Sequence, residues 1–272
     1  MGGSPSRMEI MSYYCQQKLG KPLQKAKDLG SAGGRYSLYK TGPVLCVNHN
    51  IGASTLSVVL HEIFKLLHHA GVDREDVHVI RLGTSGGVGV APGTVVISNA
   101  ACDGLKRKQF HTMVCGKEQA MDMEIDEQTA NDILQVAEDL KIPATTGMTM
   151  GTDDFYLGQG RLDGYFCDYK LNDKMSFLKE LHEFGVRNIE MESHILSAFT
   201  KRAGFKCSIV CAALLNRLEG DQVLTPKETL KEWECYPLQI VSEYIKRQVM
   251  PEVKIVDTLK ENAVEDSGNV SS

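Results

Sequence analysis

The sequence has the length and composition of a single globular domain. Its 272 residues are 42% hydrophobic and 24% charged, with a formal net charge of −5 at pH 7, and an α/β chain of this size buries a complete core. The negative balance argues against sequence-independent nucleic-acid binding, which needs a basic surface. No apolar run approaches the about 20 residues that cross a bilayer. We therefore expect neither a nucleic acid nor a membrane as a partner.

The cysteines and the start of the chain bear on its location. None of the eight cysteines forms a C-x-x-C pair, and most lie in apolar stretches such as Ile209-Val210-Cys211, which is typical of reduced, cytoplasmic proteins. The segment Met1 to Arg7 has no apolar signal core. It fits the N-myristoylation pattern M-G-x-x-x-[ST], but the same glycines suit a phosphate-binding loop, which we favour.

The first part of the chain contains helices, a hairpin and a buried strand. A polar helix follows the Gly/Pro start, and residues 35–40 and 44–47 form a hairpin around Thr41-Gly42-Pro43. Apolar residues at helical spacing over 56–67 predict a helix that ends before Gly71. Residues 77–82 are apolar and β-branched, which predicts a strand that runs into a glycine loop at 83–87.

Strands and helices alternate through the rest of the chain. The predicted strands are 95–97, 145–152, 186–190 and 206–214, and the predicted helices are 127–140, 173–184, 193–203 and 226–249. Such alternation predicts an α/β fold, with a central mixed, mostly parallel sheet flanked by helices on both faces in one domain over residues 1–250. Residues 251–272 are polar and acidic, and we expect a disordered tail there.

Two glycine-rich clusters carry arginine and suit an oxyanion. In Gly2-Gly3-Ser4-Pro5-Ser6-Arg7 the glycines allow backbone amides to approach an anion while Arg7 supplies a forked donor; alone, the segment also reads as an ordinary turn. Arg81-Leu82-Gly83-Thr84-Ser85-Gly86-Gly87 combines arginine, a hydroxyl and small residues at a strand end. It does not match the nicotinamide-cofactor fingerprint, because Pro92 stands where the last glycine is needed.

Two further clusters suit a planar ring and a sugar. In the segment 153–161, Gln159 and Arg161 lie two residues apart, and a side-chain amide can pair with an imide N–H and carbonyl such as uracil presents; a solvated loop is the alternative. Glu192 lies where a predicted strand passes into a helix and could hold vicinal hydroxyls. It could equally be an acid favoured by the helix dipole.

Three histidines on or near one predicted helix do not predict a metal site. The side chains of His61, His68 and His69 fall on or near this helix, but His68 and His69 are adjacent and so point in different directions, and no carboxylate or cysteine completes a ligand set with them. We interpret them as helix-end histidines.

Together the clusters resemble the nucleoside phosphorylases of the uridine phosphorylase type. The resemblance covers about residues 2–250 and rests on the four clusters, including Gly-Gln-Gly-Arg-Leu-Asp-Gly and Val-Arg-Asn-Ile-Glu-Met-Glu-Ser, and on Leu-Leu-Asn-Arg-Leu-Glu-Gly-Asp-Gln. It implies cleavage of uridine by phosphate to uracil and ribose 1-phosphate, as in pyrimidine salvage, by a homodimer with shared active sites. Inorganic phosphate would be a co-substrate, with no metal or organic cofactor.

The resemblance also assigns roles to single residues. Phosphate would be bound by Gly3, Arg7, Arg81 and Thr84, with Arg35 reaching it from the partner subunit. The ribose would contact Thr84, Met191 and Glu192, and the uracil ring Phe155, Gln159 and Arg161. Catalysis would depend most on Arg161, Gln159, Glu192 and Arg81.

Two alternative functions stay open. The first is a purine phosphorylase or nucleosidase of the same fold; these enzymes usually place an aspartate after the late strand, where this chain has Leu215-Asn216-Arg217. A catalytically impaired nucleoside-binding homologue is the second alternative, since the earlier strand and N-terminal histidine of the family are absent from this sequence and we expect the first strand of the sheet to be missing. Besides the missing start, the chain departs from the family pattern at Asn50 and Ser54, where the family usually has glycine and proline. Asparagine tolerates left-handed backbone, so we expect the turn at Asn50 to survive.

Overall fold

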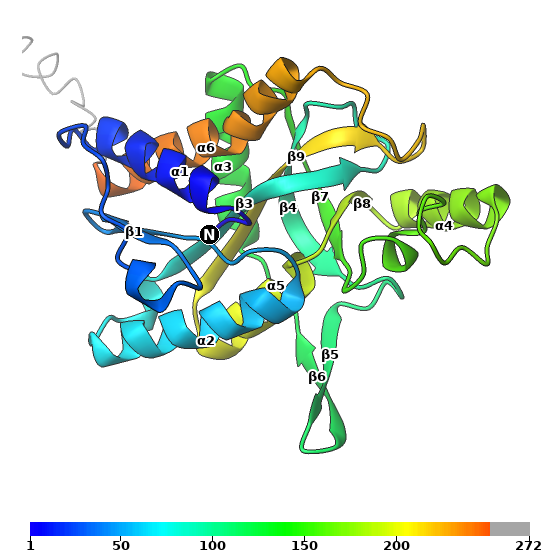
Figure 1. Ribbon diagram of the computed structural model, residues 1–272, viewed down its shortest axis with the longest axis horizontal. Coiled ribbons are helices and arrows are strands. Elements are labelled where there is room, and N and C mark those ends of the chain that lie inside the picture. The colour runs from blue at the N-terminus through cyan, green and yellow to red at the C-terminus, as the bar shows by residue number, and fades with distance from the viewer. Residues whose placement is uncertain (251–272) are drawn as a thin grey trace, which may run out of the picture.

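The computed structural model describes residues 1–250 as a β-barrel covered by helices (Figure 1). The predicted tail at 251–272 lies outside the described residues. The barrel strands are β3 (His78–Gly87), β4 (Val95–Cys102), β7 (Ala144–Gly151), β8 (Val186–Glu190) and β9 (Lys206–Asn216). They follow one another around the barrel in the order β3-β8-β7-β4-β9.

The barrel is mixed, as the sequence predicts. The pairs β3/β9, β4/β7 and β7/β8 are parallel, whereas β3/β8 and β4/β9 are antiparallel. The predicted mixed, mostly parallel sheet is therefore confirmed. Its closure goes beyond the prediction, because it depends on a short contact between β3 and β8 at Gly86 and Gly87.

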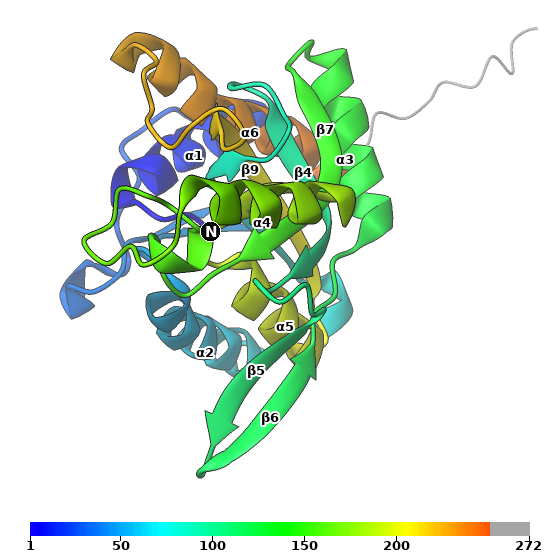
Figure 2. The same cartoon turned by 90° about the vertical axis from the view of Figure 1, so that its right-hand side faces the viewer.

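Helices cover the barrel in three groups, which Figure 2 shows from the side. The first group is α1 (Pro5–Lys18), α3 (Glu127–Asp139) and α6 (Lys227–Val249), which share one apolar core with β4. A second core lies under α2 (Ala53–His69) and α5 (Ser193–Ala203), and a third under α4 (Leu171–Glu183). Each fully buried Leu or Ile in these cores contributes about 1.5–3 kcal/mol.

Local signals explain where several helices begin and end. Ser4 precedes α1 and its hydroxyl accepts the N–H of Arg7 at 3.2 Å, with Pro5 in the first turn. After α2 the chain leaves the helix through Gly71, whose φ is +66°, in agreement with the predicted stop. The predicted glycine-rich start therefore leads directly into a capped helix.

The predicted glycine loop at 83–87 is wrong, because β3 continues to Gly87. Its pairing with β9 runs on through Thr84 and Ser85 before the register shifts. Glycine is needed here for space: a Cβ at Gly83 would collide with the guanidinium of Arg81, and one at Gly86 with that of Arg217. The glycines make room for two arginine side chains.

Two hairpins lie outside the barrel. The predicted hairpin is confirmed as β1 (Leu38–Thr41) and β2 (Val44–Val47), but its first strand begins at Leu38 rather than at residue 35 and includes Thr41. The second, β5 (Gln109–Val114) and β6 (Lys117–Asp122), was not predicted and projects from the body in Figure 1. Its strands are largely exposed, so they lack apolar alternation, and its turn has Cys115 and Gly116 at positive φ rather than an Asn-Gly signal.

The first three residues pass between β2 and β3. Gly2 donates its N–H to Val47 O at 3.0 Å and accepts that of His49 at 2.9 Å, while Leu82 donates to Met1 O at 2.8 Å. This pairing holds the glycine-rich start against the strand that carries Arg81.

The turn before α2 survives with Asn50 in place of glycine. Asn50 has a φ of +61°, as expected, and its side chain accepts from Asn48 Nδ2 at 2.9 Å and donates to Arg35 O at 3.4 Å. Because left-handed backbone penalises a Cβ, we expect Asn50→Ala to lower the free energy of unfolding by about 1–2 kcal/mol and Asn50→Gly to lower it by less. Urea denaturation of both variants measures this; equal losses would mean that backbone strain is not the reason.

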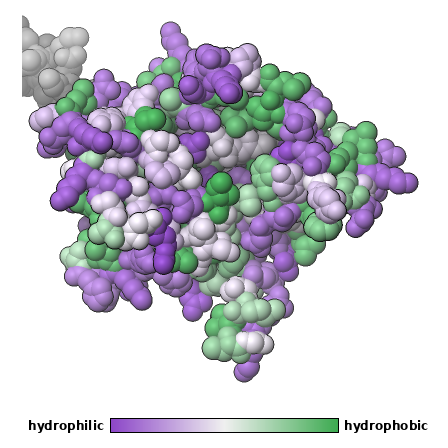
Figure 3. Space-filling model, viewed as in Figure 1, coloured by the Kyte–Doolittle hydropathy of each residue, from purple (hydrophilic) through white to green (hydrophobic). Residues whose placement is uncertain are grey.

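Within residues 1–250 no helix is long and apolar enough to span a membrane. On the face drawn in Figure 3, apolar residues are interspersed with hydrophilic ones and form no continuous belt.

Candidate active site

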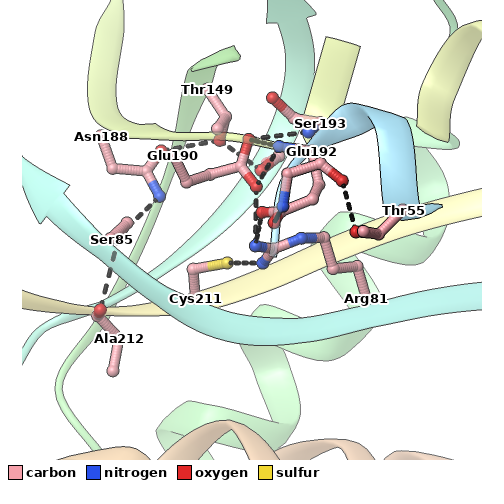
Figure 4. A network of polar contacts seen from close by, with 12 residues as sticks. Thr55, Arg81, Ser85, Thr149, Asn188, Glu190, Glu192, Ser193, Cys211 and Ala212 are labelled. Atoms are coloured by element: carbon pink, nitrogen blue, oxygen red, sulfur yellow. Dashed lines mark hydrogen bonds and ion pairs between the residues drawn. The ribbon is translucent and has the colours of Figure 1, made fainter. Parts of the chain in front are cut away.

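Figure 4 shows an arginine of the barrel, Arg81, held by two carboxylates. Arg81 of β3 forms ion pairs with Glu190, the last residue of β8, at 2.9 Å and with Glu192, the residue before α5. Its Nη1 also donates to Cys211 Sγ of β9 at 2.9 Å. Three barrel strands and one helix start therefore meet at this group, which we call the Arg81 cluster (Arg81, Glu190, Glu192 and Cys211).

The two carboxylates of the cluster have different environments. Burial raises the pKa of Glu190, although Arg81 opposes the shift. Burial would raise the pKa of Glu192 too, but the charge of Arg81, with smaller effects from His49 and the N–H of Gly52, lowers it to about 2. Glu192 is therefore an ionised acceptor at neutral pH, which suits vicinal hydroxyls.

Glu190 has a structural task at the start of α5. Its carboxylate accepts the N–H groups of Glu192, at 3.0 and 3.1 Å, and of Ser193, at 2.7 Å. These bonds satisfy donors that a helix start leaves free. They also fix the backbone that aims Glu192 at Arg81.

A polar chain supports the cluster from the neighbouring strands. Asn188 donates to Ser85 Oγ at 3.0 Å and accepts from Thr149 Oγ1 at 2.6 Å (Figure 4). Thr149 in turn contacts Ser98 Oγ at 2.5 Å. All four side chains are buried. A satisfied buried network of this kind is rigid, so it fixes β8 beside β3.

The glycine-rich start lies close to the same cluster. Gly3 is so near the turn after β2 that an added Cβ would lie 3.1 Å from Asn50 O and 4.0 Å from His49 Cε1. Arg7 lies 3.6 Å from Glu234 of α6, and its charge acts on both His49 and Cys211. The structure thus brings Gly3, Arg7 and Arg81 into one region, while their binding of phosphate stays a prediction.

The loop after β7 carries the predicted amide and guanidinium. Gln159 ends a short 3₁₀ helix (Leu157–Gln159) and is 1% exposed. Its Oε1 accepts from Arg217 Nη2, and Arg217 is held by Asp221 at 3.1 Å. Because arginine only donates, this bond fixes the amide orientation and leaves the NH₂ and one lone pair of Gln159 for a ligand.

Arg161 is held between an acid and two aromatic rings. It makes two hydrogen bonds to Asp163, at 2.8 and 2.5 Å, which lower the pKa of Asp163 to about 2. Its guanidinium carbon lies 4.4 Å from the ring centroid of Phe155 and 5.3 Å from that of Tyr156. Stacking and a bidentate pair together orient the planar donor.

The other predicted residues occupy less constrained positions. Thr84 is half-buried on β3 opposite Ala212, and Met191 is half-buried between the two glutamates of the cluster. Arg35 is exposed and lies 3.7 Å from Glu62 of its own chain. The described residues therefore do not bring Arg35 to the Arg81 cluster of the same chain.

Three residues of the site were not identified from the sequence. Glu190 and Arg217 stand in the quoted motifs, but only the structure places one against Arg81 and the other against Gln159. His49, fully buried beside Gly3, had no local signal in the sequence.

His61, His68 and His69 are exposed on α2, and residues 1–250 contain no group of three His, Cys, Asp or Glu that could hold a metal ion.

Comparison with known proteins yields matches along nearly the whole domain. The family model of the phosphorylase superfamily matches residues 1–246. The uridine and thymidine phosphorylase of Caenorhabditis elegans is 45% identical over 91% of this chain and 82% of its own. A uridine phosphorylase structure from the oomycete Phytophthora capsici has a TM-score of 0.86 at 40% identity, covering 91% of this chain and 84% of that one. The Schistosoma mansoni uridine phosphorylase in complex with uracil has a TM-score of 0.87 at 33% identity, with 91% and 86% coverage.

Proposed function

The chain belongs to the phosphorylase superfamily, and from that premise we propose that it is a uridine phosphorylase, which converts uridine and phosphate to uracil and ribose 1-phosphate. The observation that carries the proposal is the loop after β7, where Gln159 and Arg161 are both buried and Arg161 is stacked on Phe155. An oriented amide, a planar cation and an aromatic face together match an imide-bearing ring.

Phosphate binding is assigned to the region around Arg81. Gly3 allows a close backbone approach, and Arg7 and Arg81 supply forked donors to an anion, with a further hydroxyl from Thr84 of the same strand as Arg81. Arg35 is exposed, as a residue that completes the site of a second subunit must be. We therefore propose a homodimer in which Arg35 reaches the phosphate of the partner subunit.

The reaction follows from charges that these residues can stabilise. As the bond from ribose to uracil breaks, the sugar gains oxocarbenium character and the base gains negative charge, as in glycoside cleavage. Phosphate held by Arg7 and Arg81 attacks the anomeric carbon, and its negative charge stabilises the developing cation. Ionised Glu192 accepts the 2′ and 3′ hydroxyls, while Met191 contacts the apolar side of the ribose.

Stabilisation of the leaving base is assigned to Gln159 and Arg161. Negative charge on uracil grows mainly in the transition state, so donors aimed at it raise turnover more than substrate affinity. A purine would instead need an acid to protonate it. The side chain at the corresponding position, Asn216, accepts the N–H of Gly89 at 3.0 Å and donates to Glu219 at 2.9 Å, which favours the pyrimidine substrate.

Other parts of the assignment are proposals of the same kind. Phosphate supplies the nucleophile, so we propose that the reaction uses no metal or organic cofactor. The eight cysteines are unpaired thiols, which supports a reducing, cytoplasmic location.

The proposal is tested by incubating the purified 272-residue chain with uridine, with and without phosphate, and with inosine as the competing substrate. We expect uracil release that depends on phosphate, and at least a hundredfold slower release of hypoxanthine. Binding of uridine without release would instead identify a catalytically impaired nucleoside-binding homologue.

A further inference from the structure

His49 is a buried imidazole that the roles assigned so far do not use. It follows β2, and its side chain is fully buried. Within residues 1–250 neither Nδ1 nor Nε2 has a hydrogen-bond partner. Since nearly all buried polar atoms in native proteins have a hydrogen-bond partner, and leaving one without a partner destabilises the fold, two unpaired nitrogens on one ring point to a ligand.

The surroundings of the ring identify the ligand class. Cε1, the carbon between the two nitrogens, is the ring atom that faces Gly3, and the backbone N–H of His49 is bonded to Gly2 O. The charges of Arg81, Glu192 and Arg7 all act on the ring. His49 thus stands among the residues assigned to phosphate, at the boundary with the ribose-binding carboxylate.

The protonation state of His49 suits a hydrogen-bond donor without charge. Burial, assisted by Arg81, lowers the pKa of His49 to about 3. The neutral ring therefore carries one N–H and one acceptor nitrogen at neutral pH. The N–H can donate to an oxyanion, and the acceptor nitrogen can take a proton donor such as a phosphate O–H or a ribose hydroxyl.

We propose that His49 is a further phosphate-binding residue, whose ring N–H donates to a phosphate oxygen held between Gly3 and Arg81. The inference rests on the proposed phosphorolysis and adds to it a ligand contact from the turn after β2. It also explains why the sequence keeps an unsatisfied ring in the core: the bond is made only in the complex with phosphate.

The test compares His49→Phe with His49→Gln. Phenylalanine fills the same space without polar atoms, so the unliganded variant should melt at the same or a higher temperature than the wild type. Its KM for phosphate should rise about tenfold to a hundredfold, as for loss of a hydrogen bond to a charged group, while its KM for uridine changes by less than threefold. Glutamine, which keeps a donor, should recover part of the phosphate affinity.

His78→Phe is the matched control. His78 is a half-buried histidine on β3 whose Nε2 is paired with Ser208 Oγ at 2.9 Å. The His78→Phe variant should melt at a lower temperature than the wild type, with an unchanged KM for phosphate. Calorimetric titration with inorganic phosphate alone separates binding from turnover. An unchanged phosphate affinity in a folded His49→Phe variant would overturn the inference, whereas a wild-type chain without phosphate-dependent uracil release would overturn the proposed function instead.

Discussion

Replacement of Arg81 by methionine should remove phosphorolysis and weaken the fold together. The guanidinium is the only cation that ion-pairs with Glu190 and Glu192 within residues 1–250, and all three side chains are at most 6% exposed. Methionine would leave two buried carboxylates without a counter-charge, which costs about 3–5 kcal/mol. We also expect the rate of uracil release to fall by about 10²–10³ or more, as for removal of a preorganised donor to a reacting anion. Urea denaturation and steady-state kinetics measure the two effects.

The stability loss of Arg81→Met should depend on pH with a defined sign. In the wild type the pKa of Glu192 is lowered from 4.5 to about 2, so its contribution to stability is present above about pH 4.5 and is lost as the pH falls towards 2. The variant lacks this contribution at every pH. The difference in free energy of unfolding between wild type and variant should therefore narrow as the pH is lowered through that window.

Two companion variants separate the fold from the chemistry. Arg81→Lys keeps the charge but not the fork, so it should recover most of the stability and only part of the activity. Arg81→Met combined with Glu190→Gln removes one orphaned charge and should regain stability without regaining activity. An Arg81→Met variant that retains more than a tenth of wild-type turnover would contradict the phosphate-binding assignment.

The sequence predicts the regular elements well where local signals coincide. The bounds of β8 and α5 agree with the prediction residue for residue. The apolar strand ends at Glu190, whose carboxylate accepts the N–H of Ser193 at the start of the helix. The glycines of β3 led to the wrong prediction of a loop, because glycine in a sequence indicates a loop by local rules. The structure shows that they are needed for the close packing of two arginine side chains. Barrel closure has no local signal, since it depends on pairing between Gly86 and Ile189, about a hundred residues away.

The candidate site was predicted in part, for a related reason. Glu192 and Arg81 were singled out by their strand-end positions, and the structure brings them into contact. Glu190, the last residue of β8, was not singled out, because the sequence does not show that its carboxylate pairs with Arg81. Arg217 was quoted only for its neighbour Asn216, yet it orients Gln159. Motif resemblance identified the family, which the comparisons confirm, whereas the supporting residues needed coordinates.

Replacement of Arg161 by alanine should lower turnover far more than replacement of Asp153 by alanine. Arg161 is stacked on Phe155 and held by Asp163, so its donors are preorganised for charge on the leaving base, and their loss should reduce kcat by about 10²–10³. Asp153 is exposed, and its contact is with His194 at 3.0 Å. We expect less than a threefold change in kcat for Asp153→Ala. Equal effects of the two substitutions on kcat would refute the role of Arg161.

The size of the Arg161→Ala effect should also depend on the leaving group. A uridine with an electron-withdrawing substituent at C5 releases a base that carries negative charge more easily, so it needs less stabilisation from Arg161. The loss in kcat should therefore be several-fold smaller for that substrate than for uridine. Damage to the loop structure would lower both rates by the same factor, because misplacing Phe155 and Gln159 affects the binding of either ring alike. The ratio of the two losses thus reports stabilisation of the departing base directly, independently of how much folded protein each preparation contains.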